Sequence, residues 1–322
     1  MKAALVSRYG PPNVISVGET PTPQPAPREV LVRVHATTVS RTDCGELAPY
    51  PAVLARLMYG LWRPRRSIFG VDFAGVVEAT GADVTAFKVG DRVFGICPIR
   101  RNGGHAEYVC IPEDGPIARL PAHVTFENGV VCEGAYYADS CLNRANLKPG
   151  RKILIYGASG AIGSSAVQLA ELSGAEVTAV VATQHVALAR SLGADRVIDY
   201  LKEDFSKLGE RFDCVLDAVG KTSFFKCRKV MTREAVFMAA DMGAWGQNIF
   251  LLLWSAITRN GRVAIPVARS GRAPAFVKFM SELLERGQFR AVVDRTYPLD
   301  AIADAYRYVQ TGQKTGIVVV TP

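Results

Sequence analysis

One stretch, residues 151–181, constrains the fold more than any other part of this 322-residue chain. Its sequence is RKILIYGASGAIGSSAVQLAELSGAEVTAVV. Lys152 to Tyr156 is a short apolar run, typical of a strand that is buried on both faces of a parallel sheet. Three glycines follow, residues 164–173 carry apolar side chains at helical spacing, and Gly174 is placed to end that helix. Residues 176–181 form a second buried strand, so the stretch predicts a βαβ unit.

The three glycines, Gly157, Gly160 and Gly163, stand at three-residue spacing in the turn from strand to helix. Such a turn points free backbone N–H groups and the positive end of the helix dipole at one spot. A pyrophosphate can be held there only if no side chain blocks its approach. A tight turn without a ligand is the simpler alternative. The flanking strands and the helix favour a dinucleotide site.

The end of the second strand bears on which dinucleotide binds. NAD-preferring proteins usually have an acidic residue there, on the ribose hydroxyls. This chain has Val181-Ala182-Thr183-Gln184-His185, without an acid. The absence of a negative charge favours NADP(H), whose 2′-phosphate Thr183 and His185 could bind, with Arg190 further on. A solvated helix face is the alternative for His185 and Arg190.

Composition sets the broad class of the protein. The net charge is +8, but the basic residues are scattered apart from Arg63-Pro64-Arg65-Arg66, and no nucleic-acid module is visible. The longest apolar run, residues 249–257, is too short to cross a bilayer. Seven cysteines without a C-x-x-C pair predict reduced thiols. We expect a soluble cytoplasmic protein that begins directly with a strand and carries no signal peptide.

Two kinds of pattern divide the chain. Short strands with glycine turns in the first 112 residues indicate a small barrel or sandwich. Alternating helices and strands from residue 184 to 239, among them a helix at residues 222–231, indicate a doubly wound parallel sheet. We expect the closing elements after residue 292 to return to the first domain. The predicted domains are therefore 1–121 with 292–322, and 122–291.

Several separated stretches are similar to one family, the medium-chain dehydrogenase/reductases, in their zinc-free quinone oxidoreductase-like branch. They are MKAALVSRYGPP, GVDFAGVVEATG, VGDRVFG, GGHAEYV, KPGRKILIYGASGAIGSSAVQLA, RSLGADRVIDY, FDCVLDAVG and TGIVVV. The resemblance implies a GroES-like β-barrel domain joined to a Rossmann domain, in an α/β fold. It also implies hydride transfer from NADPH to quinones, enones or other activated double bonds, and a homodimer formed through residues 261–267.

The resemblance also bears on metal binding. Zinc-dependent members of the superfamily carry a Cys after the second main strand and a His-Glu pair in the next glycine segment. Here Ser40 stands in place of that Cys, and Val71-Asp72 in place of His-Glu. Zinc requires thiolate, imidazole or carboxylate ligands in a tetrahedral array, so we expect no metal.

Without zinc, another group must stabilise or protonate the acceptor oxygen. The resemblance places Ser40 and Asp43 near the nicotinamide, although Asp43 could instead cap a helix. Tyr50 and Tyr59 lie in an insertion expected to cover the cleft, with lid packing as their alternative. Tyr137 replaces a small residue of the family; it could donate to the substrate, narrow the pocket or serve only as core.

The remaining expected cofactor contacts follow from the same motifs. The turn and helix start comprise Gly157, Ser159, Gly160, Ala161, Ile162 and Gly163. We expect Tyr200 to pack on the adenine, and Ala218 and Val219 to lie where a strand end meets the cofactor. Two departures from the family weaken the NADPH assignment: Gly316-Ile317 lacks the usual Lys after the Gly, with Lys314 nearby instead, and Ala182 and Gln184 replace Ser and Arg.

Insertions at residues 54–68 and 241–256 are expected to determine substrate choice, as a lid, a membrane-surface contact or a subunit contact. The Arg cluster in the first insertion is interpreted as a solvated loop. The predicted function is reduction of a small apolar quinone or unsaturated carbonyl. A dedicated biosynthetic enoyl or imine reductase and a nucleotide-binding module without turnover are the alternatives.

Overall fold

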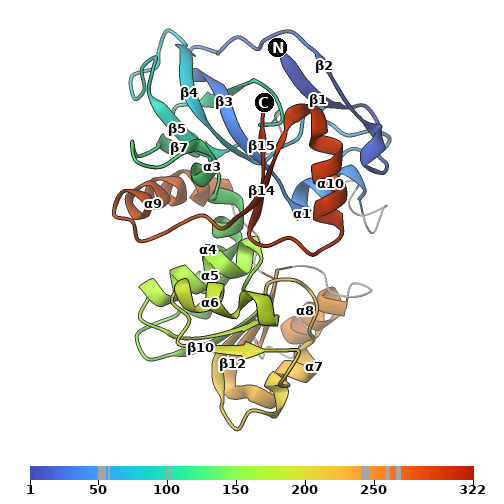
Figure 1. Cartoon of the computed structure of the whole chain (residues 1–322), viewed down its shortest axis with the longest axis vertical. Helices are drawn as coiled ribbons and strands as arrows, with labels where there is room; N and C mark the ends of the chain where they lie inside the picture. Colours follow the sequence, from blue (N-terminus) through green and yellow to red (C-terminus); the bar gives the residue numbers. More distant parts are fainter. Residues whose placement is uncertain are drawn as a thin grey trace. The chain divides into compact units, whose positions relative to one another are not determined.

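The computed structural model describes residues 1–49, 56, 59–98, 101, 103–240, 247–257, 262–265 and 270–322. The chain divides into two compact units: the first unit is Met1–Glu133 with Arg269–Pro322, and the second unit is Gly134–Ala268 (Figure 1). The expected division assigned residues 122–133 and 269–291 to the Rossmann part. They group with the first unit because helix α9 (Ala273–Glu285) contacts strands β5 and β7 of that unit.

The first unit is built on a seven-stranded sheet in the order β14-β15-β3-β4-β5-β7, with β6 also paired to β3. A separate hairpin joins β1 to β2. The strands are β1 (Lys2–Val6), β2 (Ile15–Glu19), β3 (Glu29–Val39), β4 (Asp72–Thr80), β5 (Arg92–Ile96), β6 (Tyr108–Pro112), β7 (Ile117–Arg119), β14 (Val293–Pro298) and β15 (Ile317–Thr321). The last strand, β15, pairs antiparallel with β3, so the end of the chain returns to this sheet.

Two strands of the first unit fall outside the sequence prediction. Neither β2 nor β7 was assigned from the sequence. Both are short, and each is completed by a partner elsewhere in the chain: β2 pairs with β1, and β7 with β5. A strand of three to five residues has too few positions for period 2 to show.

Helices of the first unit pack on this sheet. They are α1 (Arg41–Leu47), α3 (Phe126–Gly129), α9 and α10 (Ile302–Gln310), with 3-10 turns η1 (Pro12–Val14), η6 (Ser270–Arg272) and η7 (Leu299–Ala301). The apolar face of α10 packs against α1, β3 and β15. Its Tyr306 joins Leu47 and Phe69 in one buried cluster. This cluster fixes the start of α1, where two of the predicted catalytic residues lie.

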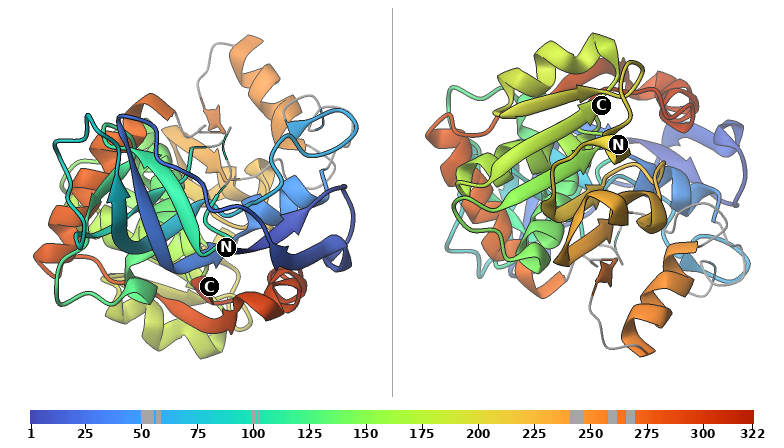
Figure 2. Two further views of the ribbon diagram at one scale, coloured as in Figure 1. Left: turned by 90° about the horizontal axis from the view of Figure 1, so that it is seen from above. Right: turned by 90° about the horizontal axis from the view of Figure 1, so that it is seen from below.

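The second unit contains a six-stranded parallel sheet in the order β10-β9-β8-β11-β12-β13. The strands are β8 (Lys152–Tyr156), β9 (Glu176–Val181), β10 (Arg196–Asp199), β11 (Phe212–Asp217), β12 (Met231–Ala239) and β13 (Val263–Ala264). The chain runs outward from β8 in one direction and then, from β11, in the other, which is the doubly wound order. The right-hand view of Figure 2, seen from below, shows this sheet. The predicted Rossmann sheet is confirmed.

Helices connect the strands of the second unit. They are α4 (Cys132–Ala145), which begins at the boundary of the units, α5 (Ala161–Leu172), α6 (Val186–Ser191), α7 (Phe224–Cys227) and α8 (Gln247–Ile257), with 3-10 turns η2 (Thr183–His185), η3 (Phe205–Lys207) and η4 (Arg228–Val230). The helix predicted at 222–231 is instead the short pair α7 and η4. It ends early because Met231 already pairs with Phe212 of β11.

Candidate functional site

The three glycines in the turn between β8 and α5 have different surroundings. Gly157 has a φ of +79°, and a Cβ there would lie 2.6 Å from the Val219 side chain. A Cβ on Gly163 would overlap the carbonyl oxygen of Gly157 and lie 2.7 Å from Cα of Ala158. A Cβ on Gly160 would meet nothing closer than 3.7 Å. Two glycines are therefore needed by the fold, and Gly160 leaves open space.

That open space lies at the start of α5. Gly160 is the N-cap, and among the described residues no side-chain hydrogen bond caps the helix there. The first turn also carries no acidic residue. The helix start, with Ala161 and Ile162 at its first two positions and Ser159 just before, thus offers backbone N–H groups to an anion. The turn fits a dinucleotide pyrophosphate.

The loop after β11 lies beside the same turn. Asp217 is fully buried, and its carboxylate accepts hydrogen bonds from the backbone N–H groups of Val219 (3.1 Å), Gly220 (2.9 Å) and Thr222 (3.0 Å). This holds Ala218 and Val219 in place, with the Val219 side chain against Gly157. The structure therefore brings these two predicted residues to the glycine turn. Asp217 is the group that positions them.

An acid that was not predicted from the sequence, Asp199, contacts the loop after β9. The hydroxyl of Thr183 donates to Oδ2 of Asp199 at 2.7 Å. Asp199 is 8% exposed and forms an ion pair with Lys202 at 3.3 Å. The hydrogen bond from Thr183 is the main reason that the pKa of Asp199 lies below its usual value. Asp199 ends β10, in register with Val181 of β9, and a comparison of neighbouring strand ends would have revealed it.

The other residues expected to face the adenosine part lie close to this loop in sequence. His185 ends η2 and is half-buried. Tyr200 directly follows Asp199 and is 47% exposed. Its ring lies 6.3 Å from the ring of Tyr156, at a low interplanar angle. An exposed aromatic face at this point suits stacking on a base.

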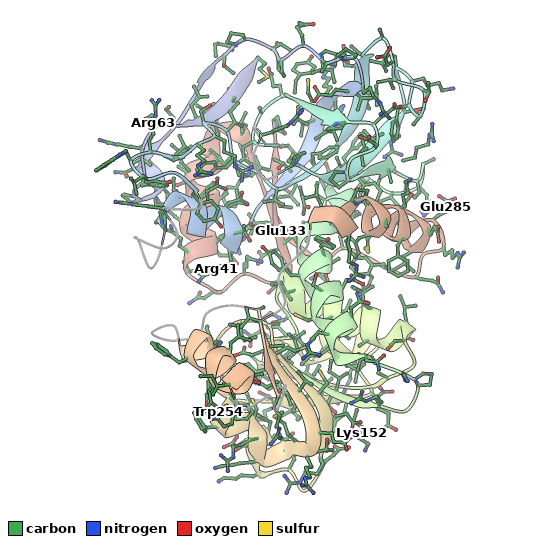
Figure 3. The ribbon with its side chains drawn as sticks, turned by 180° about the vertical axis from the view of Figure 1, so that it is seen from behind. Arg41, Arg63, Glu133, Lys152, Trp254 and Glu285 are labelled. Atoms are coloured by element: carbon green, nitrogen blue, oxygen red, sulfur yellow. The ribbon has the colours of Figure 1, made fainter. Side chains whose placement is uncertain are left out.

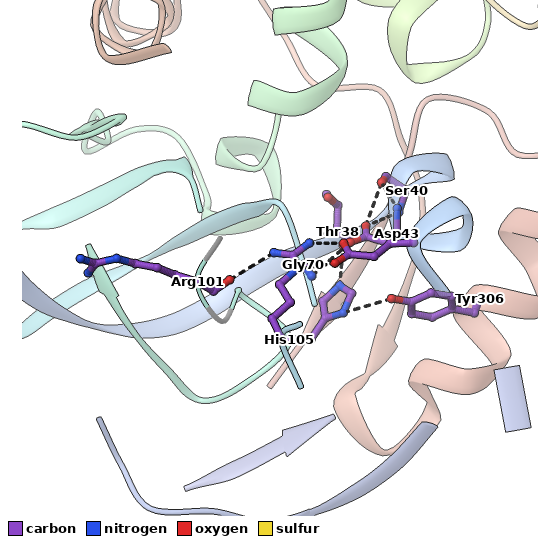
Figure 4. Close-up of polar contacts among 9 residues, drawn as sticks. Thr38, Ser40, Asp43, Gly70, Arg101, His105 and Tyr306 are labelled. Atoms are coloured by element: carbon purple, nitrogen blue, oxygen red, sulfur yellow. Dashed lines mark hydrogen bonds and ion pairs between the residues drawn. The ribbon is translucent and has the colours of Figure 1, made fainter. Parts of the chain in front are cut away.

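Ser40 and Asp43 of the first unit form one hydrogen-bonded group at the start of α1 (Figure 4). The backbone N–H and hydroxyl of Ser40 lie 2.9 and 2.8 Å from Oδ2 of Asp43, and the N–H of Asp43 donates to Oγ of Ser40 at 3.1 Å. Oδ1 of Asp43 accepts from the N–H of Gly70 at 3.1 Å. This is a capping box, with Ser40 as the N-cap. Asp43 thus positions Ser40.

His105 lies behind this group and is 1% exposed. Its Nε2 is 2.8 Å from the carbonyl oxygen of Thr38, so Nε2 carries the proton and Nδ1 accepts from the Tyr306 hydroxyl at 3.4 Å (Figure 4). Burial lowers the pKa of His105. The ring is neutral and connects β3 with α10. The contact between His105 and Tyr306 was not predicted from the sequence, because the two residues are 201 positions apart.

The interpretation of the Arg cluster as a solvated loop is wrong for Arg66, which is buried. It is 6% exposed, and its guanidinium donates to both carboxylate oxygens of Glu46, with Nε to Oε1 at 2.8 Å. Arg63 and Arg65 are exposed, as expected. Tyr59, from the same insertion, is half-buried, and burial followed by the charge of Glu46 raises its pKa.

Glu133 and Asp72 are buried acids that the sequence reasoning did not single out as functional. The N–H of Glu133 donates to Oδ1 of Asp72 at 2.8 Å, and the hydroxyl of Thr38 lies 3.4 Å from Oδ2. Burial raises the pKa of Asp72 well above its usual value. Burial, followed by the charge of Asp43, raises the pKa of Glu133 to about 7. Figure 3 marks Glu133 at the beginning of α4.

Tyr137 is half-buried on α4, four residues after Glu133. Residues four apart lie on the same face of a helix. Tyr137 belongs to the second unit, whereas Ser40, Asp43 and Tyr59 belong to the first. Tyr50 and residues 241–246 lie outside the described residues.

Neither a metal cluster nor a membrane helix is found in the described parts of the chain. No group of three or more His, Cys, Asp or Glu side chains in those parts could hold a metal ion. None of the described helices has the length and apolar content needed to cross a membrane.

Comparison with known proteins gives a consistent result. Residues 26–122 match the family "alcohol dehydrogenase GroES-like domain", and residues 192–320 match "zinc-binding dehydrogenase". The whole chain is 30% identical to NADPH-dependent alkenal/one oxidoreductase of Arabidopsis thaliana and 29% identical to 2-methylene-furan-3-one reductase of Solanum lycopersicum, covering 80% and 79% of them. The quinone oxidoreductase structure from Coxiella burnetii superposes with a TM-score of 0.86 at 26% identity, over 100% of this chain and 99% of that one.

Proposed function

The chain belongs to the medium-chain dehydrogenase/reductase superfamily, in its quinone oxidoreductase-like branch, and we propose that it reduces quinones or α,β-unsaturated carbonyl compounds with NADPH. The observation that carries the proposal is the open position at Gly160, at a helix start without a side-chain cap. The names of the relatives support the acceptor class, since they include an alkenal/one oxidoreductase and a quinone oxidoreductase.

The second unit would hold the dinucleotide. When bound, the cofactor supplies the hydride. Gly160, with Ala161 and Ile162, would bind the pyrophosphate through backbone N–H groups, and Gly157 and Gly163 keep the turn tight enough to do so. Val219, held by the loop that Asp217 organises, would contact the nicotinamide side, and Tyr200 the adenine.

The preference for NADPH over NADH is the finer part of this proposal. The loop after β9 has no acid of its own, and Thr183 and His185 would bind the 2′-phosphate. Asp199 disfavours NADPH, because its carboxylate accepts a hydrogen bond from the Thr183 hydroxyl and would repel a phosphate. Lys202, paired to Asp199, offsets part of that charge. We propose a moderate preference for NADPH.

The acceptor oxygen needs a hydrogen-bond donor while it gains negative charge. We assign this role to the hydroxyl of Ser40, with Tyr59 of the same unit as an additional donor. Tyr137 of the second unit is the alternative donor. Asp43 would keep the Ser40 hydroxyl in place through the capping box.

Assembly and location complete the proposal. β13 is the edge strand of the described part of its sheet, which supports a homodimer formed through residues 261–267. All seven cysteines are free, in keeping with a reducing compartment such as the cytoplasm.

The test is steady-state oxidation of NADPH by the purified protein with a panel of quinones, enones and saturated aldehydes, and with NADH in parallel. We expect turnover with quinones or enones, and a lower KM for NADPH than for NADH. Binding of NADPH without turnover on any acceptor would refute the reductase proposal and favour a non-catalytic nucleotide-binding role. Turnover confined to the saturated aldehydes would refute the acceptor class.

A further inference from the structure

The first insertion exposes two apolar side chains directly beside two exposed arginines. Trp62 is 88% exposed and Leu61 is 52% exposed. Arg63 and Arg65 follow them and are also exposed. Figure 3 shows Arg63 at the periphery of the first unit. We call residues 61–65 the Trp62 loop. None of its exposed side chains takes part in the proposed cofactor or acceptor contacts, so these side chains are available for another role.

The backbone of the Trp62 loop is fixed by contacts at its two ends. The N–H of Arg65 donates to the carbonyl oxygen of Tyr59 at 2.8 Å. The Tyr9 hydroxyl donates to the carbonyl oxygen of Gly60 at 2.7 Å. Gly60 has a φ of +127°, and a Cβ there would lie 2.1 Å from the carbonyl oxygen of Arg63. A turn held in this way presents its side chains without a further cost of ordering the backbone.

The segment that contains the Trp62 loop carries positive charge only. Residues 47–71 include four arginines and neither Asp nor Glu. The acid that precedes this segment, Glu46, is buried and forms its ion pair with Arg66. The exposed charge of the segment therefore comes from arginines alone. Together with Leu61 and Trp62, these arginines give one turn both an apolar and a cationic surface.

We propose that the Trp62 loop binds the surface of a membrane that contains anionic lipids. Tryptophan and leucine side chains insert at the boundary between head groups and acyl chains, and neighbouring arginines attract anionic head groups. A second copy of the chain fits this surface less well, because a symmetric contact of the loop with itself would bring the arginines of both copies together. The proposal does not depend on the reductase function, since it concerns side chains outside the cofactor and acceptor contacts.

The test is co-sedimentation of the purified protein with vesicles of phosphatidylcholine alone, or of phosphatidylcholine mixed with phosphatidylglycerol. We expect binding to the mixed vesicles that weakens as salt is added, and little binding to the neutral vesicles. Arg63→Gln/Arg65→Gln should lower the partition coefficient about 25-fold, because each arginine at an anionic surface contributes about fivefold. The control Lys278→Gln/Arg286→Gln removes the same charge from exposed positions on α9 and should bind nearly as the wild type does.

The apolar contribution has its own variants. Trp62→Ser should lower the partition coefficient about tenfold or more, because it removes a large side chain from the lipid boundary. Phe279→Ser, at an exposed aromatic position on α9, is the control and should leave the coefficient unchanged. The fluorescence emission of the wild type should shift to shorter wavelength when mixed vesicles are added. Trp62→Phe, which keeps an aromatic ring and the other two tryptophans of the chain, should still bind but lose that shift.

Circular dichroism verifies that each variant is folded, and the possible results then separate. If the wild type binds neither kind of vesicle, or binds both equally, the proposal is wrong. If the α9 control Lys278→Gln/Arg286→Gln loses as much binding as Arg63→Gln/Arg65→Gln, the overall charge of the protein binds the lipid and this loop does not. A wild-type dimer that Trp62→Ser dissociates, measured by light scattering, would identify the loop as a subunit contact and would also overturn the proposal. None of these results bears on the oxidation of NADPH, which tests the proposed function separately.

Discussion

Replacing Gly160 and Gly163 by alanine, one at a time, should separate cofactor binding from folding. Gly160 has φ −79° and ψ 175°, which alanine adopts without strain, and the nearest atom to a new Cβ is 3.7 Å away. Gly160→Ala should therefore change the free energy of unfolding by no more than about 0.5 kcal/mol. Its methyl group would stand in the space proposed for the pyrophosphate. We expect the Kd for NADPH to rise by at least about tenfold, or about 1.4 kcal/mol.

Gly163→Ala should have a different effect. Its Cβ would overlap the carbonyl oxygen of Gly157, so β8 and α5 would have to move apart. Forcing extra volume into a packed position costs about 1–3 kcal/mol. We expect a clear fall in Tm, and weaker NADPH binding only as a consequence of the distorted turn.

The assay for both variants is thermal unfolding by circular dichroism, with the Kd for NADPH from fluorescence titration. Gly160→Ala should keep the Tm of the wild type and lose affinity. If Gly160→Ala binds NADPH with the wild-type Kd, the pyrophosphate does not lie at this turn. If its Tm falls as far as that of Gly163→Ala, the different packing of the two glycines has been misinterpreted.

Three further predictions concern buried charges. Arg66→Met should lower the free energy of unfolding by about 3–5 kcal/mol in chemical denaturation, because it leaves Glu46 buried and unpaired. The double variant Arg66→Met/Glu46→Leu should regain part of that stability. If the double variant is no more stable than Arg66→Met, the unpaired charge of Glu46 is not the cause. Asp199→Asn should raise the preference for NADPH over NADH in Kd, because it removes a negative charge beside the proposed 2′-phosphate site; an unchanged ratio would place the 2′-phosphate elsewhere. The folded-state pKa of Glu133, about 7, lies above the usual 4.5, so its proton is bound more tightly in the folded protein. The stability that this provides is complete below about pH 4.5 and is lost as the pH rises to about 7, and wild-type stability relative to Glu133→Gln should decrease over that interval.

The parts of the fold that the sequence predicted are those with a strong local pattern. Strands β8 and β9 have the bounds predicted from their apolar runs, and Gly174, with a φ of +76°, follows the end of α5 as expected. The doubly wound sheet followed from the alternation of such elements. Local pattern also explains why the helix predicted at residues 222–231 was wrong. The helical spacing of apolar residues continues to Met231, but Met231 pairs as a strand residue with Phe212 of β11.

The parts of the site that could not be predicted depend on partners distant in sequence. Asp199 at the end of β10 accepts a hydrogen bond from Thr183, which follows the neighbouring strand β9. Arg66 pairs with Glu46, although the arginines of its insertion were expected to be solvated. Glu133 meets Asp72, which lies 61 positions earlier in the sequence, through its backbone N–H. Periodicity identifies which face of an element is buried, but not which side chains meet there. Buried acids outside a recognised motif are therefore found only once the fold brings them together.

Isotope labelling tests whether this protein transfers a hydride directly to an activated double bond. The purified protein would be given NADPH carrying deuterium at nicotinamide C4, in each stereochemical form, together with an enone that it reduces. We expect one of the two forms to place its deuterium on the β-carbon of the product, while the added proton comes from water. A product without deuterium from either form, or with deuterium only at the α-carbon, would contradict this expectation.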